Sequence, residues 1–378
     1  MKNYLIYTII TVLISAGYCV KAQNFYESYN PQFTGDTSDS EKFSFHLYNN
    51  NFIKNNEYFG SYTEGITYIG SVLQPEITWA ISNKFSLSGG WYFRQFYGQD
   101  EFNKSVPVIR GTYRFRPDAQ IIIGQTKGQL QHGFIEPLYN TDNYFTKNPE
   151  YGLQLLINRK KFHTDLYMDW EKFILPGETQ QEVITGGLLA DYSMNGIAEN
   201  RGLSAHFQSI IHHFGGQIDN SDSPLQSRAN LAAGLKYIFI PGSKVLDRLS
   251  LSSFYIQAME LSQTNTIPFE SGFALHNAIT FENKWAKLSI GWFHGEYFFT
   301  PLGDYLFQSV SQLNNWYVGE KRDLITPKLL IGHNIMKGVN FGFCIETYYD
   351  LQRNANDFSY GLNISVNGEV FEKKWKDQ

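Results

Sequence analysis

The sequence predicts an all-β protein, a transmembrane up-and-down antiparallel β-barrel of about 16 strands, within a range of about 14 to 18. Apolar and polar residues alternate along many segments, which is the pattern of strands whose two faces meet different surroundings. Short connections of turn residues alternate with long polar ones. Aromatic residues make up 16% of the 378 residues, whereas the mean hydropathy is only -0.32. The apolar surface is therefore spread thinly over many strands and not gathered in a helical core.

Residues 1–22 have the pattern of a signal peptide. Lys2 supplies a positive charge, Tyr4–Tyr18 is an apolar run, and Val20–Ala22 forms a small-residue cleavage pattern. A membrane-anchoring helix is the alternative, but the run is short for a membrane span and ends in that cleavage pattern. We therefore expect export with cleavage, followed by a periplasmic N-terminal segment at 23–41.

The β-barrel is expected over residues 42–371, where a period of two dominates. A first strand is expected near Phe43. The segments with the most regular alternation are Phe85–Phe93, Val108–Arg116, Phe162–Glu171, Leu203–His213 and Val339–Asp350. Two others, Ile121–Ile123 and Phe254–Ala258, break the alternation, which indicates a bulge or a buried patch at those places.

The connections between these segments are of two kinds that take turns along the chain. The short ones are rich in Asn, Gly, Pro and Asp and lie at 82–84, 116–118, 158–161, 194–196, 240–244, 283–284 and 336–338. The long ones lie at 98–105, 127–149, 172–181, 215–227, 262–271 and 298–322. Outer-membrane barrels have short periplasmic turns and long extracellular loops, so each short turn is expected to join two strands on the periplasmic side.

The last alternating segment, Phe358–Val366, has large apolar residues at every second position and Ser, Gly and Asn between them. An open apolar edge would invite aggregation, so this strand is expected to pair with the first one and close the barrel. Its apolar side chains would then face lipid and its small polar ones an aqueous interior. A polar C-terminal tail is expected at 372–378.

A secreted soluble β-protein is the main alternative to a membrane barrel, because its strands also alternate. Three features favour the membrane. The polar faces carry Arg, Asp and Glu in mid-strand, the large aromatics gather toward strand ends, and the loops differ in length between the two sides.

Together these features resemble the porin-like outer-membrane β-barrels of Gram-negative bacteria, and the Tyr, Phe and Asn content resembles those of the Bacteroidota. The resemblance is architectural, covers nearly the whole mature chain and rests on no catalytic or binding motif. It implies a location in the cell outer membrane, with lipids and the barrel-assembly machinery as partners and a homo-oligomer as a further expectation. Porin-like chains commonly end on an aromatic residue, whereas this one ends on Glu372–Gln378.

The side chains expected to line the lumen form two charged walls. Arg94, Arg110 and Arg114 would form a basic patch on neighbouring strands, and His163, Asp165, Asp169 and Glu171 an acidic one on a single strand. Further lumen-lining candidates are Lys236, Lys328 and Glu346. Opposed walls would create a transverse field that favours small polar solutes. The alternative is that these charges pair with one another and only satisfy a polar interior.

The long connection at 127–149 resembles, in length and position, the loop that enters the lumen of general porins and sets its constriction. In that arrangement His132, Glu136 and Asp142 would approach the charged walls; a surface loop is the alternative. The connection at 298–322 is rich in Tyr, Phe and Trp, which could stack on sugar rings or close the barrel mouth.

Catalysis is the less favoured reading. An acyl hydrolase needs Ser, His and an orienting group together. His206 and His212 share one face with Ser204 nearby, and His294 lies near a rim, but there is no G-x-S-x-G and no spacing that ties a serine to these histidines. We therefore expect no enzyme, no metal and no cofactor.

The sequence thus favours a channel for passive diffusion of small hydrophilic solutes. The alternatives are a structural or assembly component for surface polysaccharide or secretion, and, less favoured, an outer-membrane hydrolase. Nucleic acid is not an expected partner, because the net charge is -5 and the pI is about 6.0.

Overall fold

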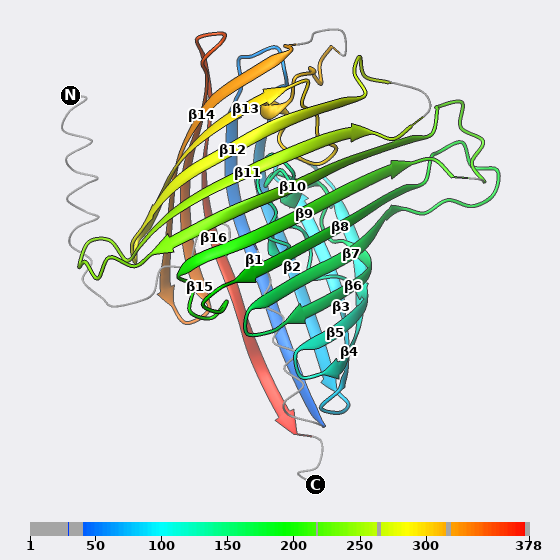
Figure 1. Cartoon of the computed structure of the whole chain (residues 1–378). Coiled ribbons are helices and arrows are strands. Elements are labelled where there is room, and N and C mark those ends of the chain that lie inside the picture. The colour runs from blue at the N-terminus through cyan, green and yellow to red at the C-terminus, as the bar shows by residue number, and fades with distance from the viewer. Residues whose placement is uncertain (1–28, 30–40, 217, 263–265, 315–318, 375–378) are drawn as a thin grey trace.

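The protein is a closed barrel of antiparallel strands (Figure 1). The computed structural model describes residue 29 and residues 41–216, 218–262, 266–314 and 319–374. Within these residues, strands β1 to β16 each pair with their neighbours in sequence, and β16 pairs with β1. The predicted up-and-down barrel is confirmed, and its strand number is the one expected.

The strands differ in length, from the short β5 to the long β16. Their bounds are β1 Lys42–Glu57, β2 Thr67–Ala80, β3 Phe85–Phe96, β4 Lys104–Arg116, β5 Ala119–Gln125, β6 Tyr151–Asn158, β7 Phe162–Lys172, β8 Val183–Ser193, β9 Gly202–Phe214, β10 Gln226–Phe239, β11 Arg248–Glu260, β12 Ser271–Glu282, β13 Ala286–Glu296, β14 Lys321–Met336, β15 Val339–Asp350 and β16 Ala355–Lys374. Among the described residues between strands, the helical turns are η2 Gln129–Gln131, α2 Asn143–Thr146 and η3 Tyr305–Phe307.

The last strand closes the barrel against the first, as its alternation predicts. Phe358 is the register partner of Glu57, and the pairing continues to Lys374 opposite Lys42. Along β16, Tyr360 and Leu362 are exposed, whereas Ser359 and Asn363 are buried. The apolar face therefore points outward and the polar face inward.

The outer surface of the wall is apolar over most of its height. Large exposed side chains occur on nearly every strand, among them Ile77, Ile109, Ile123, Leu235, Leu251 and Ile364. Exposure of so large an apolar surface to water is unfavourable, whereas its contact with bilayer hydrocarbon is favourable. Among the described residues, no helix is both long and apolar enough to cross a membrane.

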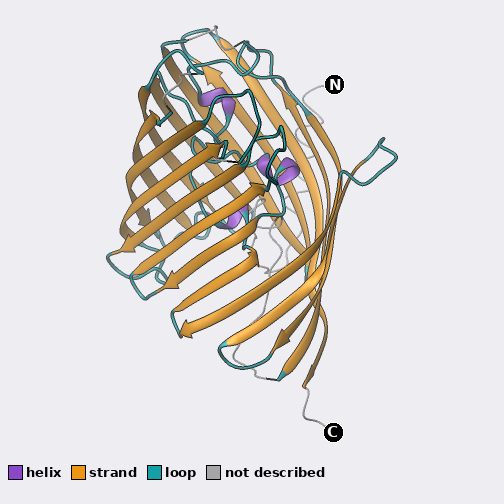
Figure 2. Cartoon of the chain, turned by 90° about the vertical axis from the view of Figure 1, so that its right-hand side faces the viewer, coloured by secondary structure: helices purple, strands orange, loops and turns teal. Residues whose placement is uncertain are grey.

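Short turns join the strands at one end of the barrel and mostly longer loops at the other, where the β15–β16 connection at 351–354 is a short exception (Figure 1). The two longest loops fold back into the barrel over their described residues, 126–150, 297–314 and 319–320 (Figure 2). The first contacts opposite sides of the ring, because Asp142 bonds Lys54 on β1 and the backbone of Ile135 bonds Gln208 on β9. Contacts with strands so far apart are available only from inside, so we call these two loops the plug.

The plug has its own hydrophobic cores against the inner wall. One core joins Leu138, Phe298 and Phe307 of the plug to wall residues such as Phe254 and Phe293. The other core consists of Tyr29, Tyr48, Phe52, Val72, Tyr92, Val108, Tyr144, Phe145, Leu330 and Cys344. The interior is thus a packed plug over much of its height, and not a water-filled tube.

The chain ends differ from the expected segment bounds. Tyr29 lies in the segment expected in the periplasm, but it is buried inside the barrel with its ring 4.6 Å from that of Tyr144. The last strand runs to Lys374 and so includes the first part of the expected tail. The expected signal peptide, residues 1–22, lies outside the described residues.

Candidate active site

The three arginines of the predicted basic wall do not form one positively charged patch. The Arg110 guanidinium forms a buried ion pair with Glu76 on β2, a partner that the sequence analysis did not single out. Arg94 is buried with its guanidinium 5.5 Å from the Phe96 ring, and Arg114 is half-buried nearer the short turns. A uniform basic patch is therefore not present.

The acidic wall on β7 is neutralised in a similar way. Asp165 contacts His132 of the plug at 2.7 Å, and Glu171 contacts Lys147 at 2.9 Å. Asp169 is buried and accepts a hydrogen bond of 2.8 Å from the backbone N–H of Tyr151. His163 lies near the short-turn end, with Nδ1 2.6 Å from Asn158 Oδ1.

The three loop candidates all lie inside the barrel and bind its wall. His132 is fully buried between Asp165 and Glu150. Asp142 accepts a 2.5 Å bond from Lys54, and Glu136 pairs with Lys328. Lys54 also lies 3.0 Å from Glu346, so the plug is fixed by a charged network across β1, β14 and β15. The charges serve mainly to hold the plug.

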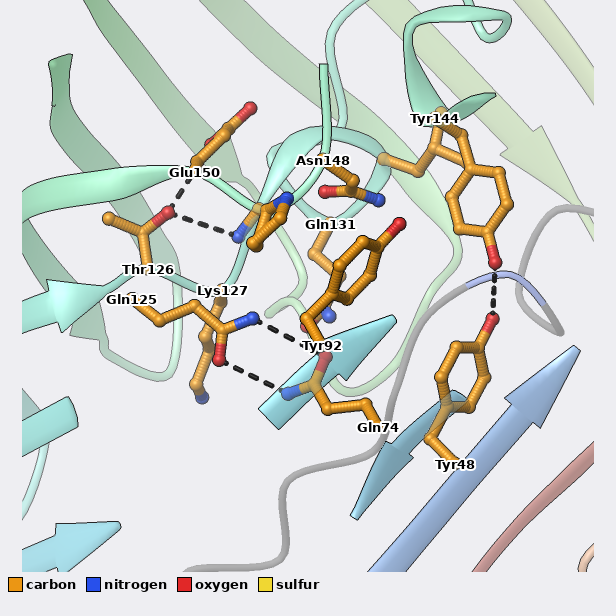
Figure 3. Close-up of a pocket in the computed structure, with 13 residues that line it drawn as sticks. Tyr48, Gln74, Tyr92, Gln125, Thr126, Lys127, Gln131, Tyr144, Asn148 and Glu150 are labelled. Carbon is orange, nitrogen blue, oxygen red and sulfur yellow. Dashed lines mark hydrogen bonds between the residues drawn. The ribbon is translucent and has the colours of Figure 1, made fainter. Parts of the chain in front are cut away.

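Little space remains between the plug and β1 to β5. A cavity of about 20 Å³ lies there, lined by Tyr48, Gln74, Tyr92, Gln125 and Tyr144 among others. Its sides are held together by bonds between Gln74 and Gln125 and between Tyr48 and Tyr144 (Figure 3). Such a volume holds one water or two, so this cavity has no room for a larger solute.

A hydrogen-bonded Ser–His–Asp set lies on the inner wall below the plug. His206 Nδ1 is 2.6 Å from Asp191 Oδ1, and His206 Nε2 is 2.8 Å from Ser204 Oγ. This is the order of contacts in a serine-hydrolase triad, where the carboxylate orients the imidazole and the far nitrogen takes the serine proton.

The strand geometry explains how the set forms. Ser204 and His206 are two residues apart on β9, so both point inward. Asp191 on β8 is the direct register partner of His206. A carboxylate, an imidazole and a hydroxyl are thereby placed on two adjacent strands, where backbone pairing fixes their spacing.

A glycine lets an aromatic ring lie beside this histidine. Gly234 on β10 is the register partner of His206 and, on its other side, of Phe254. A Cβ at Gly234 would lie 2.3 Å from the Phe254 ring, so only glycine leaves room for the ring there. The ring centroid lies 5.9 Å from that of His206. Phe254 thus forms an apolar side of the site.

The Ser–His–Asp set is open toward the short turns and closed toward the long loops. The side chains of His206 and Asp191 are 16% and 24% exposed. The next inward residue, Gln208, bonds the plug at the backbone of Gly133 and Ile135. Among the described residues, the plug therefore borders the long-loop side of Ser204.

A lysine lies on the other side of the serine. Lys236 on β10 is the register partner of Ser204, whose hydroxyl is 3.2 Å from the Lys236 carbonyl oxygen. Lys236 was expected to line the lumen, and its half-buried ammonium lies within electrostatic range of Asp191. A cation here could stabilise negative charge that develops next to Ser204.

A second Ser–His pair shows by contrast why access matters. On β1, Ser44 Oγ lies 2.8 Å from His46 Nε2, with the same spacing along the strand. Both residues are buried, at 7% and 6% exposure. The two pairs share their local geometry, but the Ser204 pair is more exposed, and its histidine bonds Asp191.

The sequence pattern places Ser204 and His206 on one face, but it gives no indication of Asp191. The expectation that no spacing ties a serine to a histidine is wrong, since S-x-H on one strand face is itself such a spacing. Asp191 could not be found because β8 has Leu188 and Leu189 on opposite faces, which hides the alternation. Its partner strand and register come only from the fold.

Solved structures similar to this one are outer-membrane barrels. Outer-membrane expressed OmpT of Vibrio cholerae has 9% identity and a TM-score of 0.51, over 87% of this chain and 98% of that one. OccK11 (OpdR) of Pseudomonas aeruginosa has 10% identity and a TM-score of 0.50, over 87% and 96%. OpdL of the same organism has 12% identity and a TM-score of 0.50, over 87% and 99%. These likenesses concern the fold alone, and they confirm the resemblance to porin-like outer-membrane barrels at the level of architecture.

The sequence comparisons correct the view of the protein as a non-enzyme. A search among curated protein sequences found no match to this chain. A family described as lipid A 3'-O-deacylase-type matches residues 35–375. A deacylase is a hydrolase, so the expectation that the chain is not an enzyme is wrong. The chain belongs to the lipid A 3'-O-deacylase-type family.

Proposed function

We propose that this protein is an outer-membrane acyl-ester hydrolase, in which Ser204 is the nucleophile, His206 the general base and Asp191 the group that orients the imidazole. The observation that carries the proposal is the continuous hydrogen-bonded chain from Asp191 through His206 to Ser204. Membership of a family described as lipid A 3'-O-deacylase-type supports it, because O-deacylation cleaves an acyl ester.

The chemistry follows from the contacts. Asp191 accepts the Nδ1–H of His206, so Nε2 is free to accept the Ser204 proton as the Ser204 oxygen attacks the ester carbonyl carbon. The tetrahedral intermediate collapses, the alkoxide leaves with the proton from Nε2, and the acyl group stays on Ser204. Water, deprotonated by His206, then releases the fatty acid and restores the hydroxyl. Lys236 is placed to stabilise the oxyanion in both steps.

The position of the site indicates from which side of the membrane the substrate arrives. The plug covers it from the long-loop side, and the open side faces the short turns, which are periplasmic in outer-membrane barrels. The substrate is therefore an O-acylated lipid, of which lipid A is the family's example, whose ester reaches the periplasmic mouth of the barrel.

A fatty-acid release assay tests the proposal. Purified full-length protein in detergent is incubated with lipid A, and the products are followed by mass spectrometry. We expect the loss of one acyl chain, and a fall in rate of about a thousandfold for Ser204→Ala. Ser44→Ala is the matched control, because Ser44 makes the same bond to a histidine in a buried position. An active Ser204→Ala protein would refute the assignment.

A second candidate is passive diffusion of small hydrophilic solutes, the function that the porin-like architecture first suggests. The polar inward residues, such as Ser359 and Asn363 on β16, favour it. The plug weighs against it, because its cores fill the interior. Steady ion conductance through the unmodified protein in a planar bilayer would support this candidate, and its absence would remove it.

A further inference from the structure

A hollow lies on the outer face of the barrel, across β3 to β6. It has a volume of about 530 Å³, and its lining includes Ile109, Gly111, Tyr113 and Ile123. The volume is within the usual range for small-molecule sites, about 300–1,000 Å³. Ile109, Tyr113 and Ile123 are exposed, so the hollow faces the bilayer and not the interior of the barrel.

The hollow forms where one outward side chain is missing. Gly111 on β4 is the register partner of Leu87 on β3 and of Ile123 on β5. The neighbours of Gly111 on the same face of β4 are Ile109 and Tyr113, both large. A Cβ at Gly111 would have no atom within 4 Å. The glycine therefore leaves a depression in a wall face that is otherwise covered by large apolar side chains.

The wall is unusually short at this place. Strand β5 has 7 residues and β6 has 8, whereas a tilted strand needs about 9–11 residues to cross the hydrocarbon of a bilayer. A short hydrophobic span is accommodated by local thinning of the bilayer and by long polar side chains that reach the headgroups. Lipid headgroups are therefore expected close to the ends of these strands.

The hollow continues to the short-turn end of the barrel. Phe85, Tyr113 and Ile121 line it and are successive register partners on β3, β4 and β5, beside the turns. Phe85 directly follows Lys84 in the turn at 81–84. The Asn158 N–H donates a 2.7 Å bond to the Asp118 carbonyl, so the turns at 117–118 and 159–161 lie side by side.

Positive charge is concentrated on these three turns. Together with the last residue of β4 they carry five exposed cationic side chains, which we call the basic rim: Lys84, Arg116, Arg159, Lys160 and Lys161. Asp118 is the one carboxylate in these turn sequences, and it pairs with Arg116 at 3.1 Å and Arg159 at 2.9 Å. An excess of cations at a membrane surface attracts anionic lipid headgroups.

We infer that the hollow and the basic rim together bind an anionic phospholipid of the periplasmic leaflet. An acyl chain would lie over Gly111, between Ile109 and Ile123, and the phosphate would lie at the rim near Lys84. A second copy of the chain is a less suitable occupant, because a two-fold interface on this face would bring one basic rim against another. The inference does not depend on the hydrolase proposal, because it uses the outer face of β3 to β6 and not the inner face of β8 to β10.

Native mass spectrometry of the full-length protein tests the inference. The protein contains Ser204→Ala, so that hydrolysis does not affect the measurement. Equal amounts of dioleoylphosphatidylglycerol and dioleoylphosphatidylcholine, which have the same acyl chains, compete for the protein in detergent. We expect at least about tenfold more of the phosphatidylglycerol adduct, because several cations act on one phosphate. Equal amounts of the two adducts would overturn the inference, and a dimer without bound lipid would overturn it in favour of a second copy.

Filling the hollow tests where the acyl chain lies. Gly111→Phe is expected to lower the amount of the phosphatidylglycerol adduct about tenfold, because the new ring occupies the depression. Gly186→Phe on β8 is the matched control. A Cβ there also has no atom within 4 Å, and the register partners Met168 and Ile211 are exposed, so this ring would face lipid too. Equal adduct in Gly111→Phe and Gly186→Phe, with both barrels folded, would overturn the inference.

Removing a rim charge tests where the headgroup lies. Lys84→Gln is expected to lower the preference for phosphatidylglycerol over phosphatidylcholine about fivefold, which is the effect of one cation near a membrane surface. Lys244→Gln, at an exposed lysine in the turn between β10 and β11, is the matched control and should leave the preference unchanged. The same loss of preference in both variants would show that net charge, and not the basic rim, selects the lipid, and would overturn the inference.

Discussion

At the residue scale, two histidines in carboxylate pairs have opposite roles. His132 is fully buried between Glu150 and Asp165, and its ring stacks on Tyr167 with centroids 3.7 Å apart. His206 binds one carboxylate, is partly exposed and has a hydroxyl on its other nitrogen. The first arrangement offers no access for a substrate and holds the plug, whereas the second leaves room for chemistry. Burial and the second partner distinguish the two, and neither is visible in the sequence.

The pairing of His132 predicts a pH-dependent stability. Burial would lower the pKa of His132, but the Glu150 and Asp165 carboxylates outweigh it and raise the pKa to about 10. The unfolded value is about 6.5, so the folded state holds this proton more tightly. The stabilisation is complete below about pH 6.5, and it is lost as the pH rises through about 10.

Thermal unfolding in detergent measures this effect. We expect the transition temperature of the unmodified protein to fall between about pH 6.5 and pH 10. His132→Gln should unfold at a lower temperature in mild acid and lose most of that dependence. His333→Gln is the control, because the His333 ring stacks on Trp285 and not between two carboxylates. The same slope in His132→Gln and the unmodified protein would contradict the prediction.

At the element scale, the strands show why alternation predicts the wall better than the site. Phe254–Ala258 breaks the alternation, and the structure shows the buried patch that was one of its two explanations: Phe254, Ile256 and Ala258 face inward and pack in a plug core. Polar inward residues identify a strand that faces water. Where the plug packs, inward residues are apolar, and the pattern no longer tells inside from outside.

The row of residues across β8 to β11 gives a second test at this scale. Asp191, His206, Gly234 and Phe254 are successive register partners on these four strands. In Gly234→Ala the new Cβ would displace the Phe254 ring, which borders His206. We expect esterase activity to fall about ten- to a hundredfold, because a small misplacement of a catalytic group is costly.

The control for this variant is another glycine on a strand. Gly89→Ala introduces a Cβ at a position with nothing within 4 Å, so folding and activity should be retained. Heat-modifiable migration on gels would report whether each variant forms the barrel. If Gly234→Ala folds and is fully active, Phe254 has no role in placing His206.

At the scale of the whole molecule, the sequence predicts the barrel wall better than the plug inside it. Strand number, closure of β16 on β1 and the two loop classes follow from period and turn chemistry, which are local properties. The plug depends on contacts between residues far apart in sequence, such as Glu136 with Lys328 and Asp142 with Lys54. No local pattern encodes such pairs. The expected lumen was therefore an aqueous one, whereas the observed interior is packed.

Removing the plug should turn the barrel into a channel. Gln125 and Tyr151, which flank the first plug loop, are register partners, as are Glu296 and Lys321, which flank the second. A short turn can therefore replace either loop without moving the strands. Both loops contribute to one core, which contains Leu138 of the first and Phe307 of the second, so either alone should still obstruct the lumen.

We expect stepwise ion currents in planar bilayers only when both loops are shortened. Shortening 215–225, a long loop of which no described residue belongs to either plug core, is the matched control and should leave the barrel closed. Currents of equal size in the control and the double variant would show that the plug does not seal the barrel.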